Sequence, residues 1–207
     1  ISNHFCKKGF IITILDNNSR GSLKRISQYK KKIKFIYGDI TKYKDVYKAA
    51  KGQDYIFHLA AINGTKFFYE KPDKVLDVSC KGIINVIDAA KKLNIKNIFL
   101  ASSSEVYHFP KKIPTDETES IKIPDILNPR YSYAGGKILT ELMGINNAKY
   151  FNKMIKKLNN IIIEGSAGKP ILIDVTLKAN AQPKQVVVFC HGFKGFKDWG
   201  PFNKIAA

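Results

Sequence analysis

Residues 54–104 read DYIFHLAAINGTKFFYEKPDKVLDVSCKGIINVIDAAKKLNIKNIFLASSS. Two short β-rich runs, at 54–61 and 97–104, flank a longer segment at 72–94. That segment places apolar residues at helical spacing, namely Val75, Val78, Ile83, Val86, Ile87 and Ala90. A strand, a helix and a second strand in this order form a βαβ unit, and such units build parallel sheets. This stretch therefore predicts an α/β fold.

The same alternation extends toward the N-terminus. The runs FIITILD (10–16) and IKFIYGD (33–39) are typical of buried strands, and a helix is expected at 42–52. We therefore predict a doubly wound parallel sheet with four strands from this region. Ligands bind such sheets at the carboxyl ends of the strands. Several polar residues fall at these ends: Asp16, Asp39, His58 and Ser102 to Ser104.

The chain changes character after about residue 157. Three short β runs follow, separated by turns rich in Gly, Pro and Asn. The sequence thus predicts two units, at 1–156 and 157–207, the second a short and mostly β tail.

Composition narrows the class of protein. The 207 residues carry a formal net charge of +18, but the excess is mostly lysine spread along the chain, with three arginines. This pattern favours solvated faces over nucleic-acid binding. The apolar runs are too short to span a bilayer, and no signal-peptide pattern is present. Because the three cysteines are scattered and the four histidines do not cluster, we expect reduced thiols, a cytoplasmic setting, no membrane partner and no metal site.

The segment RYSYAGGKILTE (130–141) places Tyr133 four residues before Lys137. Alone, this spacing only makes the two side chains neighbours on a helix. Three companions strengthen it: ILDNNSRGS (14–22), YGDI (37–40) and FLASSSEVY (99–107). Together these stretches resemble the extended short-chain dehydrogenase/reductases, and more narrowly the NAD-dependent nucleotide-sugar epimerases and dehydratases, over residues 1 to about 155.

The resemblance implies a Rossmann-like fold, NAD as cofactor, a nucleotide-sugar substrate and transient hydride transfer. It implies a catalytic set of Ser103, Tyr133 and Lys137. Lys137 is expected to lower the phenol pKa of Tyr133, so that a phenolate exists near neutral pH and removes a sugar hydroxyl proton. Ser103 is expected to hydrogen-bond the same oxygen. The resemblance also allows a homodimer through a bundle that includes the Tyr-Lys helix.

Residues in contact with the cofactor follow from the same resemblance. Asp16 is expected at the adenosine ribose, and Asp39 and Ile40 at the adenine. The complete expected set is Asp16, Asn17, Asp39, Ile40, Leu59, Ala60, Ala61, Ser102, Tyr133 and Lys137.

Ser104 and Glu105 hold positions that take part in elimination steps in dehydratase and decarboxylase relatives. They are therefore added to the catalytic candidates, with a solvated turn as the alternative for Glu105. Arg130 either meets an acidic substrate group or pairs with a surface carboxylate, and we favour the pairing. Epimerisation and dehydration or decarboxylation both stay open.

The chain also departs from the family. The glycine-rich GxxGxxG turn and the strand before it are missing, and Ser79 stands where Asn is usual. We therefore expect a truncated unit with weakened NAD affinity and impaired activity. Because the missing strand is normally central, the tail strands either fill the gap, pair with each other or stay unpaired. The alternative is a non-catalytic fusion fragment or scaffold without cofactor binding.

The tail has its own resemblance. Its stretch VVVFCHGFKGFKDWGPFNKIA (186–206) resembles the opening strand and HG loop of an α/β-hydrolase. This resemblance implies that the backbone N–H of Phe193 would be an oxyanion-hole donor and that His191 is part of the HG loop. The G-x-S-x-G nucleophile motif is missing, so we expect no hydrolase activity and interpret residues 157–207 as a truncated hydrolase-like segment.

Overall fold

The computed structural model describes residues 2–20, 23–113, 115, 118–148, 161–164, 170–173 and 185–189. The described elements, in chain order, are α1 (Ser2–Lys7), β1 (Ile11–Asp16), the 3₁₀ helix η1 (Leu23–Lys32), β2 (Ile33–Tyr37), α2 (Tyr43–Ala50), β3 (Tyr55–His58), α3 (Thr65–Glu70), α4 (Pro72–Lys92), β4 (Asn97–Leu100), the 3₁₀ helices η2 (Ser104–Val106) and η3 (Pro129–Tyr131), α5 (Ser132–Asn147), β5 (Ile161–Glu164), β6 (Pro170–Ile173) and β7 (Gln185–Phe189).

The main sheet has five parallel strands in the order β2-β1-β7-β3-β4. The predicted parallel α/β sheet is therefore confirmed, and its four expected strands are present. The central strand, however, comes from the tail. β7 pairs with β1 from Ile11↔Gln185 to Leu15↔Phe189, and with β3 from Tyr55↔Val186 to His58↔Phe189. The tail thus closes the gap that the sequence predicts.

The two other tail strands follow a different course. β5 and β6 form a separate antiparallel pair, from Ile161↔Ile173 to Glu164↔Pro170. Two of the three outcomes considered for the tail therefore occur together. The predicted boundary near residue 156 and the hydrolase-like loop at 190–193 lie outside the described residues, so the division into two units stays a prediction.

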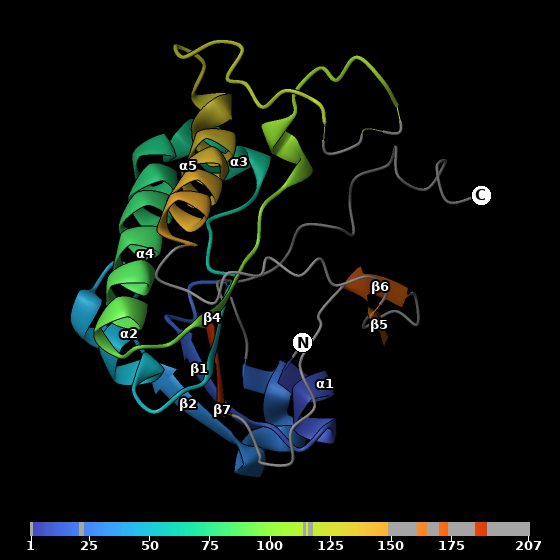
Figure 1. Ribbon diagram of the computed structural model, residues 1–207. Coiled ribbons are helices and arrows are strands. Elements are labelled where there is room, and N and C mark those ends of the chain that lie inside the picture. The colour runs from blue at the N-terminus through green and yellow to red at the C-terminus, as the bar shows by residue number, and fades with distance from the viewer. Residues whose placement is uncertain are drawn as a thin grey trace.

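Helices cover both faces of the main sheet (Figure 1). On one face, Leu15, Ile36 and Ile56 pack against Val46 of α2 and Val86 of α4. On the other face, α1 and η1 pack over β1 and β2 through a second cluster, Phe5, Cys6, Ile12, Ile14, Ile33 and Phe57, with Ile26 at its edge. Because neighbouring strand residues point to opposite faces, β1 supplies both clusters. This is the doubly wound arrangement expected from the sequence.

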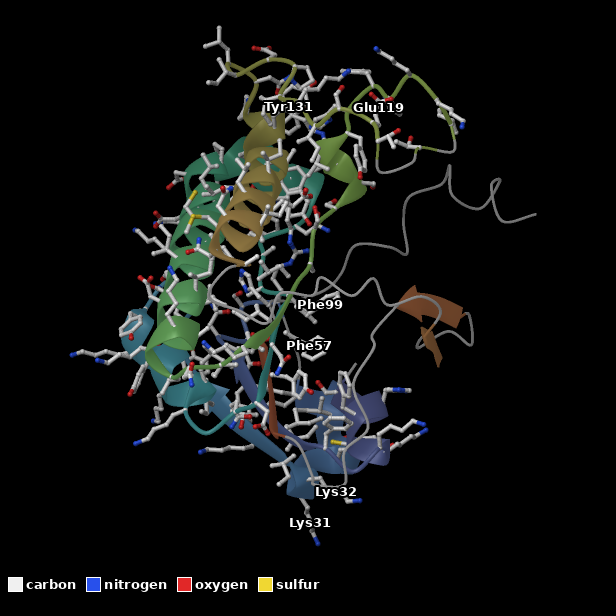
Figure 2. All side chains as sticks on the ribbon, viewed as in Figure 1. Lys31, Lys32, Phe57, Phe99, Glu119 and Tyr131 are labelled. Carbon is white, nitrogen blue, oxygen red and sulfur yellow. The ribbon has the colours of Figure 1, made fainter. Side chains whose placement is uncertain are left out.

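The second cluster continues toward β4. Figure 2 shows Phe57 and Phe99 side by side, and their rings stack with centroids 5.3 Å apart. Lys31 and Lys32 are exposed at the end of the molecule away from Tyr131 (Figure 2). These two positive charges are therefore solvated and remote from the start of α5.

Helices α4 and α5 lie side by side along one face (Figure 1). They approach closely at Gly136, where an added Cβ would lie 2.5 Å from the Cβ and Oγ of Ser79. Ser79 is buried, and its hydroxyl donates to the carbonyl of Val75 at 2.9 Å. A side chain at position 136 would force the helices apart. Glycine at this position lets α5 pack closely onto α4, and this packing positions the segment of α5 that carries Tyr133 and Lys137.

Some described elements have no counterpart in the sequence predictions, among them η1 at Leu23–Lys32 and α3 at Thr65–Glu70. α3 matters most for the site, because it contributes Phe68 to the surroundings of Tyr133. Among the described residues, no helix is both long enough and apolar enough to cross a membrane.

Candidate functional site

The first candidate residue lies at the carboxyl end of β1. Asp16 ends this strand, and its side chain is buried. Its Oδ1 accepts a hydrogen bond at 2.7 Å from the backbone N–H of Asn18, which adopts the left-handed conformation (φ 53°). Burial raises the pKa of Asp16 above its usual value, against the opposing effect of the Asn18 hydrogen bond. The strand end therefore presents a partly desolvated carboxylate.

The neighbouring strand end carries a second carboxylate. Asp39 Oδ1 accepts hydrogen bonds from the backbone N–H of Thr41 at 2.8 Å and from its hydroxyl at 2.7 Å. Asn17 Nδ2 donates to Asp39 Oδ2 at 3.4 Å. Burial acts to raise the pKa of Asp39, but the hydrogen bonds from Thr41 and Asn17 and the charge of Lys42 outweigh it, so the pKa is lowered. The loops after β1 and β2 are thus joined beside Asp16.

The remaining residues predicted at the cofactor lie in different apolar clusters around the sheet. Ile40 is buried in the cluster under α2 and α4, and its carbonyl accepts a hydrogen bond from Asn85 Nδ2 at 2.9 Å. Leu59 packs at the edge of the cluster on the opposite face. Ala60 and Ala61 follow β3 and are buried, and Ala61 shares a cluster with Tyr133. The end of β3 therefore meets the Tyr-Lys helix.

The structure brings Ser103, Tyr133 and Lys137 together from two segments. Tyr133 and Lys137 lie one turn apart in α5, and both are buried. Ser103 follows β4, and its side chain is near enough to the Tyr133 phenol to act on the phenol pKa. Lys137 Nζ lies 5.7 Å from the centroid of the Tyr133 ring. The serine and the lysine thus both lie near the phenol.

The lysine is held by the main chain of the β4 loop. Lys137 Nζ donates to the carbonyl of Ala101 at 2.6 Å. Burial lowers the pKa of Lys137 to about 8, while the carboxylate of Glu141, one turn further along α5, acts to raise it. Glu141 also accepts a hydrogen bond from the hydroxyl of Ser102. Ser102, predicted at the cofactor, is therefore linked to the carboxylate beside Lys137.

The expected phenolate at Tyr133 needs a correction. Burial raises the pKa of Tyr133 above its usual value, the Ser103 side chain acts to lower it, and Glu105 acts to raise it. Lys137 therefore does not by itself bring the phenol into the neutral range, because desolvation of the phenolate dominates. In the chain alone, Tyr133 is a neutral phenol at pH 7.

His58 lies behind this group, at the end of β3. Burial lowers its pKa to about 3, and the positive charge of Lys137 acts in the same direction. The folded chain therefore keeps His58 neutral over a range in which an unfolded chain would protonate it. A Cβ at Gly82 would lie 3.6 Å from its Cε1, so α4 packs closely over the ring.

This difference predicts a pH dependence of stability. Between about pH 6.5 and about pH 3, the unfolded state binds a proton at His58 that the folded state does not. The free energy of unfolding should therefore fall on acidification, with a contribution from His58 of about 1.4 kcal/mol per pH unit. Urea unfolding of the wild type and of His58→Gln at pH 7.5, 6, 5 and 4.5 measures it.

The carboxylates titrate in both proteins, so the difference between the two pH profiles isolates the histidine. We expect the profile of His58→Gln to be flatter below pH 6.5. Parallel profiles would show that the folded chain protonates His58 as readily as the unfolded chain does.

Glu105 and Arg130 form an ion pair beside the site. Arg130 Nη2 lies 2.9 Å from Glu105 Oε2 and 3.0 Å from Oε1, with side chains 20% and 18% exposed. The favoured pairing of Arg130 with a carboxylate is confirmed, although that carboxylate is mostly buried and not on the surface. The alternative of Glu105 as a solvated turn residue is wrong, because the η2 turn directs it at Arg130. Ser104 begins η2, and Ser103 Oγ accepts the Glu105 N–H at 3.3 Å.

Sequence reasoning missed two contributors to this site. Phe68 of α3 is 1% exposed and stacks on Tyr133, with ring centroids 5.1 Å apart. The short segment TKFFYE carries no periodic signal that marks Phe68. Glu141, by contrast, lies four residues after Lys137, and that spacing was available as a signal. Among the described residues, no group of three or more His, Cys, Asp or Glu side chains could hold a metal ion.

Comparison with known proteins adds a family match. The model of the NAD dependent epimerase/dehydratase family matches residues 1–171. This match runs past the boundary predicted near residue 156.

Individual similar proteins are named as enzymes of the same kind. The chain is 30% identical over 162 residues to a UDP-N-acetyl-alpha-D-glucosaminuronate decarboxylase of Bacillus cytotoxicus, covering 73% of this chain and 50% of that protein. An epimerase structure from Methanothermobacter thermautotrophicus superposes with a TM-score of 0.64 and 31% identity, over 72% of this chain and 43% of that one. The structure of a UDP-N-acetylglucosamine 4-epimerase from Methanobrevibacter ruminantium, in complex with UDP-N-acetylmuramic acid, superposes with a TM-score of 0.59 and 26% identity. This match covers 67% of this chain and 43% of that one. The chain thus spans about half the length of the relatives it matches.

Proposed function

This chain belongs to the NAD dependent epimerase/dehydratase family, and we propose that it carries the part of such an enzyme that binds NAD and moves a proton at a hydroxyl of a nucleotide-sugar. The observation that carries this proposal is the convergence of three groups: Tyr133 and Lys137 lie one turn apart and buried in α5, and Ser103, from the loop after β4, is near enough to act on the phenol pKa. A hydroxyl and a phenol that lie near each other, with a cation beside them, are suited to passing a proton to and from a third oxygen.

The residues at the strand ends fit a dinucleotide. Asp16 uses Oδ1 for Asn18, and its Oδ2 has no hydrogen-bond partner among the described residues. A free carboxylate oxygen at the end of a parallel strand suits a ribose diol, which presents hydroxyl donors. Buried Ala60 and Ala61 leave no bulky side chain at the end of β3. These residues would hold NAD between the β1 loop and the Tyr-Lys helix.

NAD, when bound, supplies the hydride acceptor. The proton transfer is assigned to three side chains of this chain, each with a separate role. To act as the base, Tyr133 must first lose its own phenol proton to solvent; the phenolate Oη then receives the proton of the sugar hydroxyl, and Ser103 Oγ hydrogen-bonds the same sugar oxygen. Lys137, held in position by the Ala101 carbonyl, places a positive charge beside the ring and so stabilises the phenolate before it takes up that proton. Because burial raises the pKa of Tyr133, proton removal needs this charge together with any further positive charge that the bound state brings.

The substrate class is part of the proposal. Relatives named as a UDP-sugar decarboxylase and as UDP-sugar epimerases match over similar lengths, so both reaction types stay open. A homodimer through α4 and α5 also belongs to the proposal. Exposed apolar side chains on these two helices support it: Leu76, Ile84, Leu142 and Ile145.

The test is a calorimetric titration of the purified chain with NAD. We expect saturable binding, and we expect Asp16→Asn to weaken it at least tenfold, because the amide removes the charge while keeping the shape. Asp88→Asn is the matched control, since this residue is an exposed carboxylate in α4. It should bind NAD as the wild type does.

Two outcomes would count against the proposal. Absence of binding up to millimolar NAD would favour the alternative of a scaffold without cofactor binding. Equal loss in Asp16→Asn and Asp88→Asn would show that the affinity depends on overall charge and not on the predicted ribose site.

A further inference from the structure

The ion pair between Arg130 and Glu105 is placed next to the ring that covers Tyr133. The guanidinium carbon of Arg130 lies 5.1 Å from the centroid of Phe68, within the range of a cation–π contact. Phe68 in turn stacks on Tyr133 with an interplanar angle of 17°. Lys137 Nζ lies 5.7 Å from the centroid of the same phenol ring. The guanidinium, the phenyl ring and the phenol are therefore in successive contact, with the ammonium near the phenol.

Together with the Arg130–Glu105 pair, these contacts join three separate stretches of the sequence. Phe68 belongs to α3, Glu105 to η2, and Arg130 and Tyr133 to the continuous stretch of η3 and α5. Arg130 contacts both the η2 carboxylate and the α3 ring. It is thus the side chain that ties the loop after β4 to the helix after β3.

The Arg130–Glu105 pair is also mostly buried, so its charges carry a desolvation cost. Both side chains are largely withdrawn from water, and burying two charges costs free energy that their attraction often fails to recover. Stability alone is therefore a weak reason to keep such a pair. Arg130 Nη1 is buried and has no hydrogen-bond partner among the described residues, which adds to the cost. A pair of this kind is better explained by what it holds in place.

We propose that Arg130 is a positioning residue for Tyr133: it holds the Phe68 ring against the phenol and cancels the negative charge of Glu105 beside it. Glu105 then serves as the partner that orients Arg130. This inference rests on the proposed role of Tyr133 in proton transfer. It goes beyond that role because it assigns the orientation and charge balance of the phenol to residues outside the Ser-Tyr-Lys set.

The charges of Glu105 and Arg130 are expected to shift the phenol pKa of Tyr133 in opposite directions. Glu105 acts to raise the pKa of Tyr133, and a positive charge paired with that carboxylate, as on Arg130, is expected to offset it. Among the described residues, Lys137 is a further charged group near the phenol, and its charge also acts on His58, which stays neutral. Removing Arg130 alone leaves Glu105 uncompensated. Removing Glu105 alone leaves an extra positive charge, and removing both restores the balance.

The experiment replaces Tyr133 with 3,5-difluorotyrosine, whose phenol is intrinsically more acidic, and follows its titration by ¹⁹F NMR in the ligand-free chain. The signal belongs to position 133 alone, so the nine other tyrosines do not interfere. The variants are Arg130→Gln, Glu105→Gln, the double variant and Arg130→Lys. Circular dichroism and urea unfolding check that each variant is folded.

We expect Arg130→Gln to raise the pKa of the fluorinated phenol by about one unit and Glu105→Gln to lower it by a similar amount. The double variant should return close to the wild type. Arg130→Lys keeps the charge and should stay near the wild type in pKa. It loses the planar guanidinium over Phe68, so the ¹⁹F line of Tyr133 should broaden or shift as the ring loosens.

Arg20→Gln is the matched control. Arg20 also lies over a phenylalanine of α3, with its guanidinium carbon 4.8 Å from the Phe67 centroid, but that ring is not the one stacked on Tyr133. This variant should leave the titration unchanged. An unchanged pKa in Arg130→Gln, or a rise in Glu105→Gln, would overturn the inference. Should Arg130→Gln fail to fold, the other two single variants decide it: the inference requires a lower phenol pKa in Glu105→Gln and a pKa near the wild type in Arg130→Lys.

The readout needs neither NAD nor substrate. A chain that binds no NAD but shows these shifts would contradict the proposed function and leave the charge balance established. A chain that binds NAD but shows no shift would contradict only the inference.

Discussion

Val187→Pro is expected to remove the cooperative unfolding of the five-stranded sheet or to lower its midpoint sharply. Val187 is the middle residue of β7, which pairs with Thr13 of β1 on one side and Ile56 of β3 on the other. Proline has no N–H to donate and is not tolerated in a central strand. Loss of β7 pairing would divide the sheet into β2-β1 and β3-β4, with two unpaired inner edges.

Urea unfolding followed by circular dichroism, with light scattering for aggregation, measures this effect. We expect a loss of at least about 3 kcal/mol. Leu172→Pro is the matched control, because it makes the same change in β6, which belongs to the separate antiparallel pair. That variant should unfold with the wild-type midpoint. Equal stability of Val187→Pro and wild type would mean that β7 contributes nothing to the main sheet.

Tyr133→Phe should abolish turnover of a UDP-sugar by the NAD-loaded chain. The phenol oxygen is the group that the proposal assigns to proton transfer, and positioned acid–base groups contribute about 10²–10⁴-fold to rate. The aromatic ring and its stacking on Phe68 remain, so the fold should be unchanged. NMR of UDP-glucose and UDP-glucuronate, each incubated with NAD and chain, detects both epimerised and decarboxylated products.

Tyr131→Phe is the control for this change. Tyr131 lies two residues earlier, in η3, where its ring meets His108 edge-on with centroids 4.5 Å apart. Its hydroxyl is given no part in the proton transfer, and the variant should keep wild-type turnover. Equal activity of wild type and Tyr133→Phe would exclude Tyr133 as the proton-transfer group. Equal loss in both tyrosine variants would indicate a structural effect.

Much of the fold was predictable because its signals are local. Alternating β-rich runs and a 3.6-residue apolar period give β1 to β4 and α4, with ends within a few residues of the observed ones. The candidate site was predictable in the same way, since its residues follow strands directly or share a helix turn. The phenol pKa was not, because it depends on how deeply Tyr133 is buried, and neighbouring residues do not encode depth.

The amino-acid sequence was sufficient for the fold class, the strand ends that carry Asp16 and Ser103, and the Tyr133–Lys137 spacing. Each of these depends on residues close together in the chain. The tertiary structure decided three other points: the insertion of β7 between β1 and β3, the pairing of Arg130 with Glu105, and the stacking of Phe68 on Tyr133. Short apolar strands such as VVVF are equally compatible with several neighbours. Their partners are chosen by which assembly covers the open strand edges and buries the facing side chains together, and only the folded chain contains that information.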